Sequence, residues 1–229
     1  MCEHTFGIHL AQTEVARQSV NTLLNRMYSW RGYAGRHHVD AHPNRITLAA
    51  SGEAGVIGTV TLGTDSSSGI LADEIFKPEI DVHRQRGARI CEVTKLAVDP
   101  IGYSKMALAS LFHIVYIYAH KIHECTDMFI EINPRHRRYY EKMLGFQREA
   151  DMRDNPRVNA PAYLMRISLD YMESQIERLG GTSAAPGAER SLYPYFFDRR
   201  EETGIMHRLL HWRDAAPPQH FAHSRAGAR

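Results

Sequence analysis

The chain has 229 residues, of which 43% are hydrophobic and 24% are charged, and its formal net charge is +2. This composition is typical of a globular protein with a substantial core, and so small a net charge gives no general case for nucleic-acid binding. The three cysteines include no CxxC pair, which favours free thiols in a reducing compartment. The most apolar run, 107–119, is too short to span a bilayer, and the first residues lack the pattern of a secretory signal. We therefore expect a cytoplasmic protein.

The first eighty residues predict a strand, a helix, a hairpin and a second helix. Thr13 is a suitable N-cap for the first helix, and Gly52 lies in the expected hairpin turn. The turn-rich segment 30–44 has a length that is often functional in loops. Pro78 should end or kink the second helix. The predicted elements are strand 6–10, helix 13–28, strands 45–51 and 55–63, and helix 71–79.

The rest of the chain alternates between strand and helix patterns and then ends in an appendage. The helix 104–123 is the most apolar element, and its apolar residues extend beyond one face. A stretch rich in Gly, Ala, Ser and Pro, 180–191, is typical of a linker. The predicted elements are strand 88–98, helix 104–123, strand 128–132, helix 135–144, strands 146–149 and 162–169, a helix to 179, and an appended helix 193–212. The domains expected from this pattern are an α+β domain at 1–180, a linker and appended helix at 181–213, and a disordered tail at 214–229.

The strand 88–98 is the most informative, because it carries Glu92 and Lys95 among apolar and β-branched residues. A buried charge is costly unless it is paired or used. In a regular strand the two side chains point to opposite faces, and a β-bulge between them would bring both to one face. We interpret this segment as an active-site strand, with a salt-bridged inner strand or an edge strand as the alternative.

A metal site is not predicted. His120, His123 and Cys125 have a spacing found among metal ligands, but the sequence offers no second cluster to complete a site. We interpret these residues as a solvated helix end.

A second informative stretch begins where Asn133-Pro134 ends an apolar strand, and it continues as a basic helix closed by Gly145-Phe146. This order resembles the GNAT acyltransferases, whose motif of Asn, helix, Tyr and closing Gly-Phe matches Asn133, Tyr139 or Tyr140, and Gly145-Phe146. The resemblance implies a GNAT fold, an α/β sandwich in which helices flank a mixed sheet and the central strand splays from its neighbour. It also implies that the pantetheine arm of the acyl carrier pairs with the exposed strand edge. The substrate contacts implied are Leu96, Ala97, Val98 and Asn133.

The turn after the charged strand reads D-P-I-G-Y-S-K-M-A. In the GNAT family, acetyl-CoA users bind pyrophosphate with a Gly-rich loop at a helix N-terminus. Of the residues typical of that loop, this turn keeps only Gly102. This departure favours an acyl donor other than a soluble coenzyme thioester.

The runs V-I-G-T-V-T-L-G-T-D, I-L-A-D-E-I-F and I-C-E-V-T-K-L-A-V also resemble the acyl-homoserine-lactone (autoinducer) synthases. The upstream run L-L-N-R-M-Y-S-W places Arg26 and Trp30 near matching substrate-binding positions. Two departures distinguish the chain: Thr61 stands where those enzymes carry an arginine, and Lys95 replaces a second arginine.

The FeeM-type N-acyl amino acid synthases are a related group that the chain resembles over most of residues 10–210. The resemblance rests on E-V-T-K-L-A-V, N-P-R-H-R-R-Y-Y-E-K-M-L-G-F, N-A-P-A-Y-L-M-R-I-S-L and S-L-Y-P-Y-F-F-D-R-R-E-E. It implies transfer of a long acyl chain from an acyl carrier protein to the α-amine of an amino acid. The donor would be held on the carrier's phosphopantetheine, with acyl-CoA as an alternative and no tightly bound cofactor. Two other hypotheses are an autoinducer synthase and an inactive GNAT-like domain that binds lipid or carrier protein.

The chemistry of such a transfer suggests roles for several residues. Glu92 is the expected base for the attacking amine, beside Lys95 on the same strand. A backbone N–H within 95–97 would stabilise the oxyanion. Tyr139 or Tyr140 would protonate the leaving thiolate, although a tyrosine on an apolar helix face is more often part of the core.

The long helix and the basic helix are expected to serve the acyl chain and its carrier. Leu111, Ile114, Ile117 and Tyr118, which lie off the main apolar stripe, are predicted to line an acyl tunnel beside the splayed strands, and Phe112 and Val115 are further predicted substrate contacts. The alternative is that the off-stripe residues only pack under the appended helix. An amphiphilic product would also allow contact with a membrane surface. The residues predicted to dock the acidic carrier are Lys105, Arg135, Arg137, Arg138 and Lys142, for which a solvated helix face is the alternative.

Overall fold

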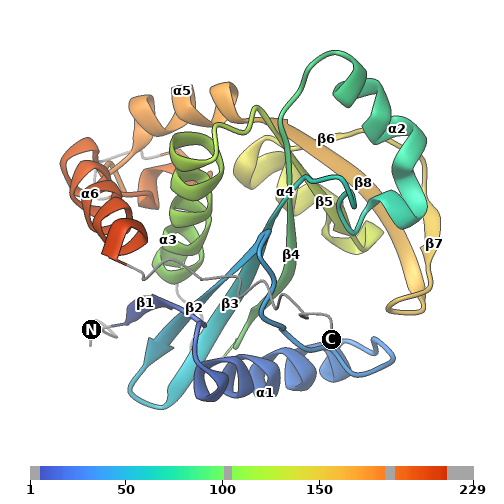
Figure 1. Cartoon of the computed structure of the whole chain (residues 1–229), viewed down its shortest axis with the longest axis horizontal. Coiled ribbons are helices and arrows are strands. Elements are labelled where there is room, and N and C mark those ends of the chain that lie inside the picture. Colours follow the sequence, from blue (N-terminus) through green and yellow to red (C-terminus); the bar gives the residue numbers. More distant parts are fainter. Residues whose placement is uncertain (1–5, 101–104, 184–188, 216–229) are drawn as a thin grey trace, which may run out of the picture.

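A mixed β-sheet forms the centre of the protein, in a computed structural model that describes residues 6–100, 105–183 and 189–215 (Figure 1). The strands lie in the order β1-β2-β3-β4-β5-β8-β6, and β7 pairs with β8. β4 and β5 are parallel, whereas the other neighbouring strands are antiparallel. The strands are β1 (Gly7–Leu10), β2 (Arg45–Gly52), β3 (Gly55–Thr64), β4 (Ile90–Val98), β5 (Asp127–Ile132), β6 (Gln147–Arg148), β7 (Arg153–Asn155) and β8 (Ala160–Ser168).

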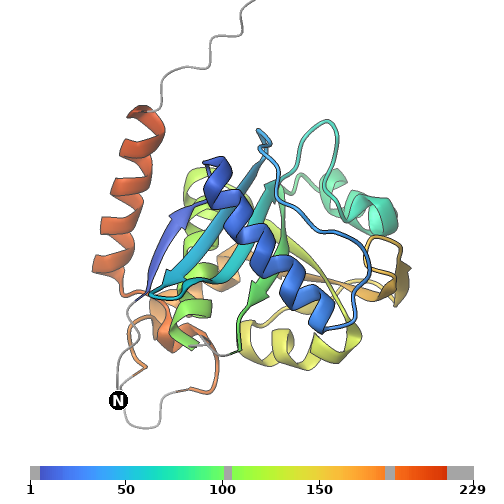
Figure 2. The same ribbon diagram turned by 90° about the horizontal axis from the view of Figure 1, so that it is seen from below.

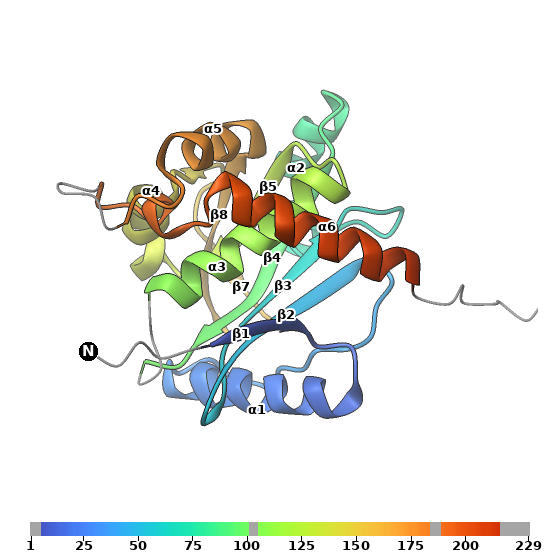
Figure 3. The same cartoon turned by 90° about the vertical axis from the view of Figure 1, so that its left-hand side faces the viewer.

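Helices cover both faces of the sheet, as the predicted α+β sandwich requires. α1 packs Leu23 and Leu24 against Ala97 of β4, while α3 packs Leu108 and Val115 onto the opposite face. Figure 3 shows α1 and α3 on opposite sides of the strands. The helices are α1 (Glu14–Trp30), α2 (Asp73–Gln85), α3 (Lys105–Tyr116), α4 (Arg137–Leu144), α5 (Leu169–Leu179) and α6 (Arg199–Ala215), with a π-helix (Ile117–Ile122) extending α3.

The structure corrects several predicted boundaries. α2 does not stop near Pro78 but continues to Gln85, because the chain absorbs the proline in a kink at Phe76, whose φ of −122° is not helical. The short strand β7 was not predicted, since its residues R-D-N carry no apolar alternation. The appended helix α6 begins at Arg199 rather than at residue 193, where the chain forms a single 3₁₀ turn.

Two expectations fall on residues outside the described ranges. They are the loop that contains Gly102 and most of the C-terminal tail. In the described part of the chain, every helix is too short or too polar to cross a lipid bilayer.

The appended helix is fixed to the domain through a buried histidine of α3. His113 is fully buried and stacks between the rings of Phe196 and Phe197. Its Nδ1 accepts a hydrogen bond of 2.9 Å from the Phe197 N–H, and its Nε2 lies 3.2 Å from Oε2 of Glu202 in α6. Figures 2 and 3 show the result, with α6 running beside α3 on the face of the sheet away from α1.

Candidate active site

β4 is irregular at the residues that the sequence distinguishes. Its pairing with β3 shifts between Thr59 and Thr61, where Lys95 and Leu96 lie opposite a single residue of β3. Lys95 also has a φ of 51°, in the left-handed region that a bulge can require. The predicted β-bulge is therefore confirmed.

The bulge changes which side chains share a face. Glu92 bonds to the start of α2, and Lys95 Nζ donates to the carbonyl of His38 in the loop after α1, so both lie on the face that α1 and α2 cover. Leu96 and Val98 instead pack with the core beneath α3. In a regular strand Leu96 and Val98 would share the face of Glu92, and the inserted residue reverses this arrangement.

A cavity opens where β4 and β5 separate. The two strands pair from Ile90 to Val93 of β4, and their pairing ends at Ile130 of β5. Beyond this point lies a cavity of about 220 Å³. β4 remains paired with β3 as far as Val98, so its edge toward β5 is open beside the cavity. This is the splay that the GNAT resemblance implies.

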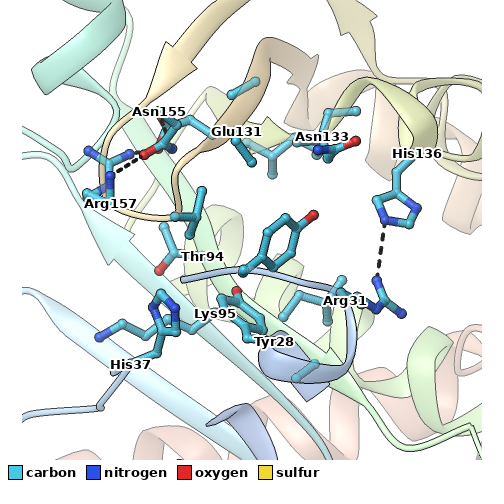
Figure 4. A pocket seen from close by; sticks show the side chains of 18 of the residues that line it. Tyr28, Arg31, His37, Thr94, Lys95, Glu131, Asn133, His136, Asn155 and Arg157 are labelled. Atoms are coloured by element: carbon cyan, nitrogen blue, oxygen red, sulfur yellow. Dashed lines mark hydrogen bonds and ion pairs between the residues drawn. The ribbon is translucent and has the colours of Figure 1, made fainter. Parts of the chain in front are cut away.

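One end of the cavity carries an ion-pair network (Figure 4). Arg157, in the turn between β7 and β8, donates to the carboxylates of Glu131 and Glu74 and to the carbonyl of Leu71 at 2.9 Å. Asn155 Nδ2 lies 3.5 Å from Oε1 of Glu131. Burial raises the pKa of Glu131, while Arg157 opposes this shift. Glu131, Asn155 and Arg157 line the cavity, whereas Glu74 lies outside its lining, so this end of the cavity offers a carboxylate held by a guanidinium and a side-chain amide.

Two histidines line other walls of the cavity, and burial lowers the pKa of both. His136 Nε2 lies 3.4 Å from Arg31 Nη1 and 3.2 Å from Arg135 Nε, so it must accept rather than donate. His37 is held by Asn25 of α1, whose side chain bonds to both the N–H and the carbonyl of His37. Both imidazoles are therefore neutral near pH 7. His37 Nε2 lies 3.0 Å from the Ala34 carbonyl and donates to it, which leaves Nδ1 of His37 as the acceptor, whereas the acceptor nitrogen of His136 is occupied by the two arginines.

Of the two predicted tyrosines, Tyr140 lines the cavity and Tyr139 does not. Burial raises the pKa of Tyr140 to about 12, which keeps its phenol protonated at any working pH. Its ring contacts Phe112 and Phe146 edge to face. Tyr28 of α1 also lines the cavity, and burial raises its pKa as well.

Glu92 lies beside this cavity without lining it. It is 2% exposed, and its two carboxylate oxygens accept the backbone N–H groups of Leu71 and Ala72 at 2.8 and 3.1 Å. A side chain at Gly63 would begin only 3.2 Å from the Glu92 carboxylate, so a larger residue at this position of β3 would press against Glu92. Burial raises the pKa of Glu92 to about 7, against these two hydrogen bonds. Its role as a base stays a prediction, while its contacts fix the start of α2.

The remaining predicted substrate contacts are distributed over several places. Lys95, Leu96, Ala97 and Asn133 line the cavity. Those outside its lining are Val98, Arg26, which pairs with Asp99 at 2.5 Å, Trp30, which is 68% exposed, and the core residues Leu111, Phe112 and Val115.

Three of the predicted carrier-docking residues, Arg135, Arg138 and Lys142, are exposed. Arg137 pairs with Glu141 one helical turn later at 3.0 Å, and Lys105 Nζ lies 5.0 Å from the ring of Tyr195. Sequence reasoning missed Arg31, which is exposed and reaches His136 at the cavity.

The chain matches the family model described as the N-acyl amino acid synthase FeeM over residues 19–168, which is more than half of its length. The chain belongs to this family. A solved FeeM structure, an N-acyl amino acid synthase from uncultured soil microbes, is 25% identical with a TM-score of 0.66, over 74% of this chain and 93% of that chain. The predicted resemblance is thereby confirmed, and the protein is an acyltransferase that acts on an amine.

More distant structures share the fold. The acyl-homoserine-lactone synthase LasI is 10% identical over 72% of this chain and 91% of that chain, with a TM-score of 0.52. An acyl-CoA N-acyltransferase from Pseudomonas aeruginosa is 11% identical over 71% and 97%, with a TM-score of 0.51. No curated protein matches the chain by sequence. The appended helix α6 lies beyond the residues that the FeeM family model covers.

Proposed function

We propose that this acyltransferase moves a long-chain acyl group from an acyl carrier protein to the α-amine of an amino acid. The observation that carries the proposal is one cavity that joins an open strand edge to a polar pocket. The edge is the bulged part of β4, and the pocket is formed by Glu131, Asn155 and Arg157. A thioester and an amine can meet only where both kinds of surface are adjacent.

The donor would lie along the open edge of β4, where amide groups of the pantetheine arm can replace the missing partner strand. The N–H groups next to the bulge at Lys95 would then face the thioester carbonyl and stabilise its oxyanion in the tetrahedral intermediate. The acyl chain would continue past Ala97 and Ile132, the apolar part of the cavity wall.

The acceptor would be oriented by charge. The Glu131 carboxylate, which lines the cavity, can accept hydrogen bonds from the α-ammonium group, and Lys95, which also lines it, supplies a cation for the α-carboxylate. Burial lowers the pKa of Lys95, and a carboxylate bound beside it would favour the charged form. A free amino acid satisfies both ends, whereas a simple amine satisfies one.

The reaction then needs proton transfers at both the nitrogen and the sulfur. The ammonium group loses one proton to a neighbouring base, the neutral amine forms a bond to the thioester carbonyl carbon, and the nitrogen loses a second proton from the tetrahedral intermediate. Collapse of the intermediate breaks the C–S bond, Tyr140 can donate its proton to the departing thiolate, and the phenolate recovers a proton from solvent. The candidate bases are the neutral imidazole of His37, and Glu92 acting through water.

A carrier protein as donor is supported by the cations beside the cavity. Arg31 and Arg135 are exposed, and the Arg135 guanidinium lies 3.4 Å from the Arg31 carbonyl. Acyl carrier proteins are acidic, and a compact basic rim gives such a partner both attraction and orientation.

The test uses the purified full chain with acyl carrier protein loaded with C8 to C16 chains, and separately with the matching acyl-CoA esters. Each amino acid is supplied in turn, thiol release is followed by a colorimetric reagent, and products are identified by mass spectrometry. Thiol release with an N-acyl amino acid as product supports the proposal. A lactone formed with S-adenosylmethionine would replace it with an autoinducer synthase, and carrier binding without thiol release would leave a binding domain.

A further inference from the structure

A second cavity, larger than the catalytic one, lies under the appended helix. Its volume is about 530 Å³, within the range of about 300–1,000 Å³ that is typical of small-molecule sites. Its floor includes Ile8 of β1 and Ile114 of α3, and its roof includes Ile205 and Leu209 of α6. The cavity is partly open to solvent, and an apolar occupant would remove its apolar lining from water.

The cavity belongs to the appendage and not to the catalytic sheet edge. Its lining shares no residue with the lining of the cavity between β4 and β5. In Figure 3 α6 passes in front of α3, and the cavity beside it reaches the edge strand β1 at Ile8. The His113–Glu202 contact holds α6 at this distance from α3 beside the cavity. The helix thus has a fixed anchor at one end and an apolar space below its middle.

One charged group in the lining is available to a ligand. Glu201 turns back to the helix start, where its Oε2 accepts the Asp198 N–H at 3.2 Å while Asp198 accepts the Glu201 N–H at 2.8 Å. This capping box satisfies the carboxylate of Glu201. Arg208, by contrast, is exposed and makes no ion pair with any residue of the described ranges. The cavity therefore joins an apolar interior to an unpaired guanidinium.

We infer that this cavity binds a long-chain carboxylate, with the chain between α3 and α6 and the carboxylate on Arg208. Guanidinium and carboxylate form paired charge-assisted hydrogen bonds, and each methylene group removed from water contributes about 0.8 kcal/mol. Two molecules share this chemistry: a free fatty acid and an N-acyl amino acid. The site is argued from the cavity alone, and only the N-acyl amino acid as its ligand rests on the proposed function.

The experiment measures binding to the purified full chain by equilibrium dialysis, with dodecanoate, N-dodecanoylglycine and dodecanol as probes. Arg208→Gln should weaken binding of the carboxylates to this site about tenfold and leave dodecanol unchanged. Leu209→Trp should fill the cavity, so that one equivalent of each probe is lost. Arg200→Gln is the matched control, because Arg200 is an exposed arginine of α6 outside the cavity lining.

The outcomes distinguish a fatty acid from an N-acyl amino acid as the ligand, and either of them from the absence of a site. Binding of dodecanoate alone assigns a fatty acid to the site, and binding of N-dodecanoylglycine alone assigns the acylated amino acid. Equal carboxylate binding by the wild type and by both the Arg208 and Leu209 variants overturns the site. Arg208 is exposed, so its variant keeps the test decisive even if Leu209→Trp fails to fold. Because no assay of acyl transfer is involved, failure of the proposed function would not affect this result.

Discussion

The two halves of β4 differ in almost every physical respect. From Ile90 to Val93 the strand is paired on both sides and buried, and the charge of Glu92 is met by two backbone N–H groups. From residue 94 to Val98 it carries a bulge, has β3 as its only ladder partner in the described chain, and lines a cavity. The first half is part of the buried core, and the second half offers the open edge on which the proposed acyl transfer depends.

This contrast shows that a charged residue in a strand can serve either the fold or the cavity. Glu92 and Lys95 are three positions apart and share one face because of the bulge, yet Lys95 lines the cavity and Glu92 lies behind it. A perturbed pKa alone does not locate a catalytic group, since structural networks shift pKa values too. The experiments below test whether Glu92 contributes to stability, to turnover, or to both.

The largest expected effect is on stability. The pKa of Glu92 rises from its usual 4.5 to about 7 in the folded protein. The folded state therefore binds the proton more tightly, and the contribution of Glu92 to stability is greatest below about pH 4.5 and is lost as pH rises through about 7. The difference amounts to about 3 kcal/mol.

Urea unfolding of the wild type and of Glu92→Gln between pH 5 and 8 measures this contribution. Gln cannot ionise, so the free energy of unfolding of the wild type should fall relative to that of the variant as the pH rises. A constant difference between the two proteins across this range would show that the carboxyl group has an ordinary pKa.

The second effect is on turnover. If Glu92 is the base, Glu92→Gln should keep carrier binding and lose about 100-fold in kcat. The wild-type kcat/KM should rise with pH through about 7, and this limb should vanish in the variant. His37→Gln is the comparison, because His37 lines the cavity and its Nδ1 can accept a proton. Near-normal turnover of Glu92→Gln with a large loss in His37→Gln would make Glu92 a structural residue only.

The bulge could be predicted because the sequence itself poses the problem: two charges at odd spacing in an apolar strand must either be separated or share a face. The ion-pair network around Arg157, at the other end of the cavity, could not be predicted from the sequence. Arg157 meets Glu74 and Glu131, residues far apart in the chain, through a turn beside the unpredicted strand β7. No local pattern brings these three together, and tertiary pairing alone places them.

The acyl-tunnel prediction shows a second limit. All ten residues from Ala107 to Tyr116 of α3 are buried, because the helix packs against both the sheet and α6. Leu111 packs against Gly58 of β3, and Ile114 lies under α6, as the alternative interpretation expected. A helix that is apolar all round indicates burial on all sides, and its periodicity cannot tell which side holds a ligand.

A third effect concerns the leaving group. Tyr140→Phe should lower kcat about tenfold, since a thiolate departs readily and its protonation is only part of the barrier. Tyr139→Phe is the matched control, because the neighbouring Tyr139 does not line the cavity. KM for the carrier should stay the same in both variants. Equal kcat values for the two variants would remove Tyr140 from the proton transfer and leave it as a wall of the cavity.

The smallest effect is expected at the rim of the open half. Arg135 and Arg138 are exposed, so they would lie at the rim of an interface with the carrier. Exposed charges at a rim each contribute little to binding. Reversing both charges, Arg135→Glu with Arg138→Glu, should raise KM for the acyl carrier protein severalfold and flatten its dependence on salt, because fewer charges are then screened. kcat at saturating carrier should not change. The control reverses Arg199 and Arg200, two exposed arginines at the start of α6, far along the chain from α4. If the control pair changes KM and the salt dependence while the α4 pair does not, the carrier docks on the appendage and not beside the open edge of β4.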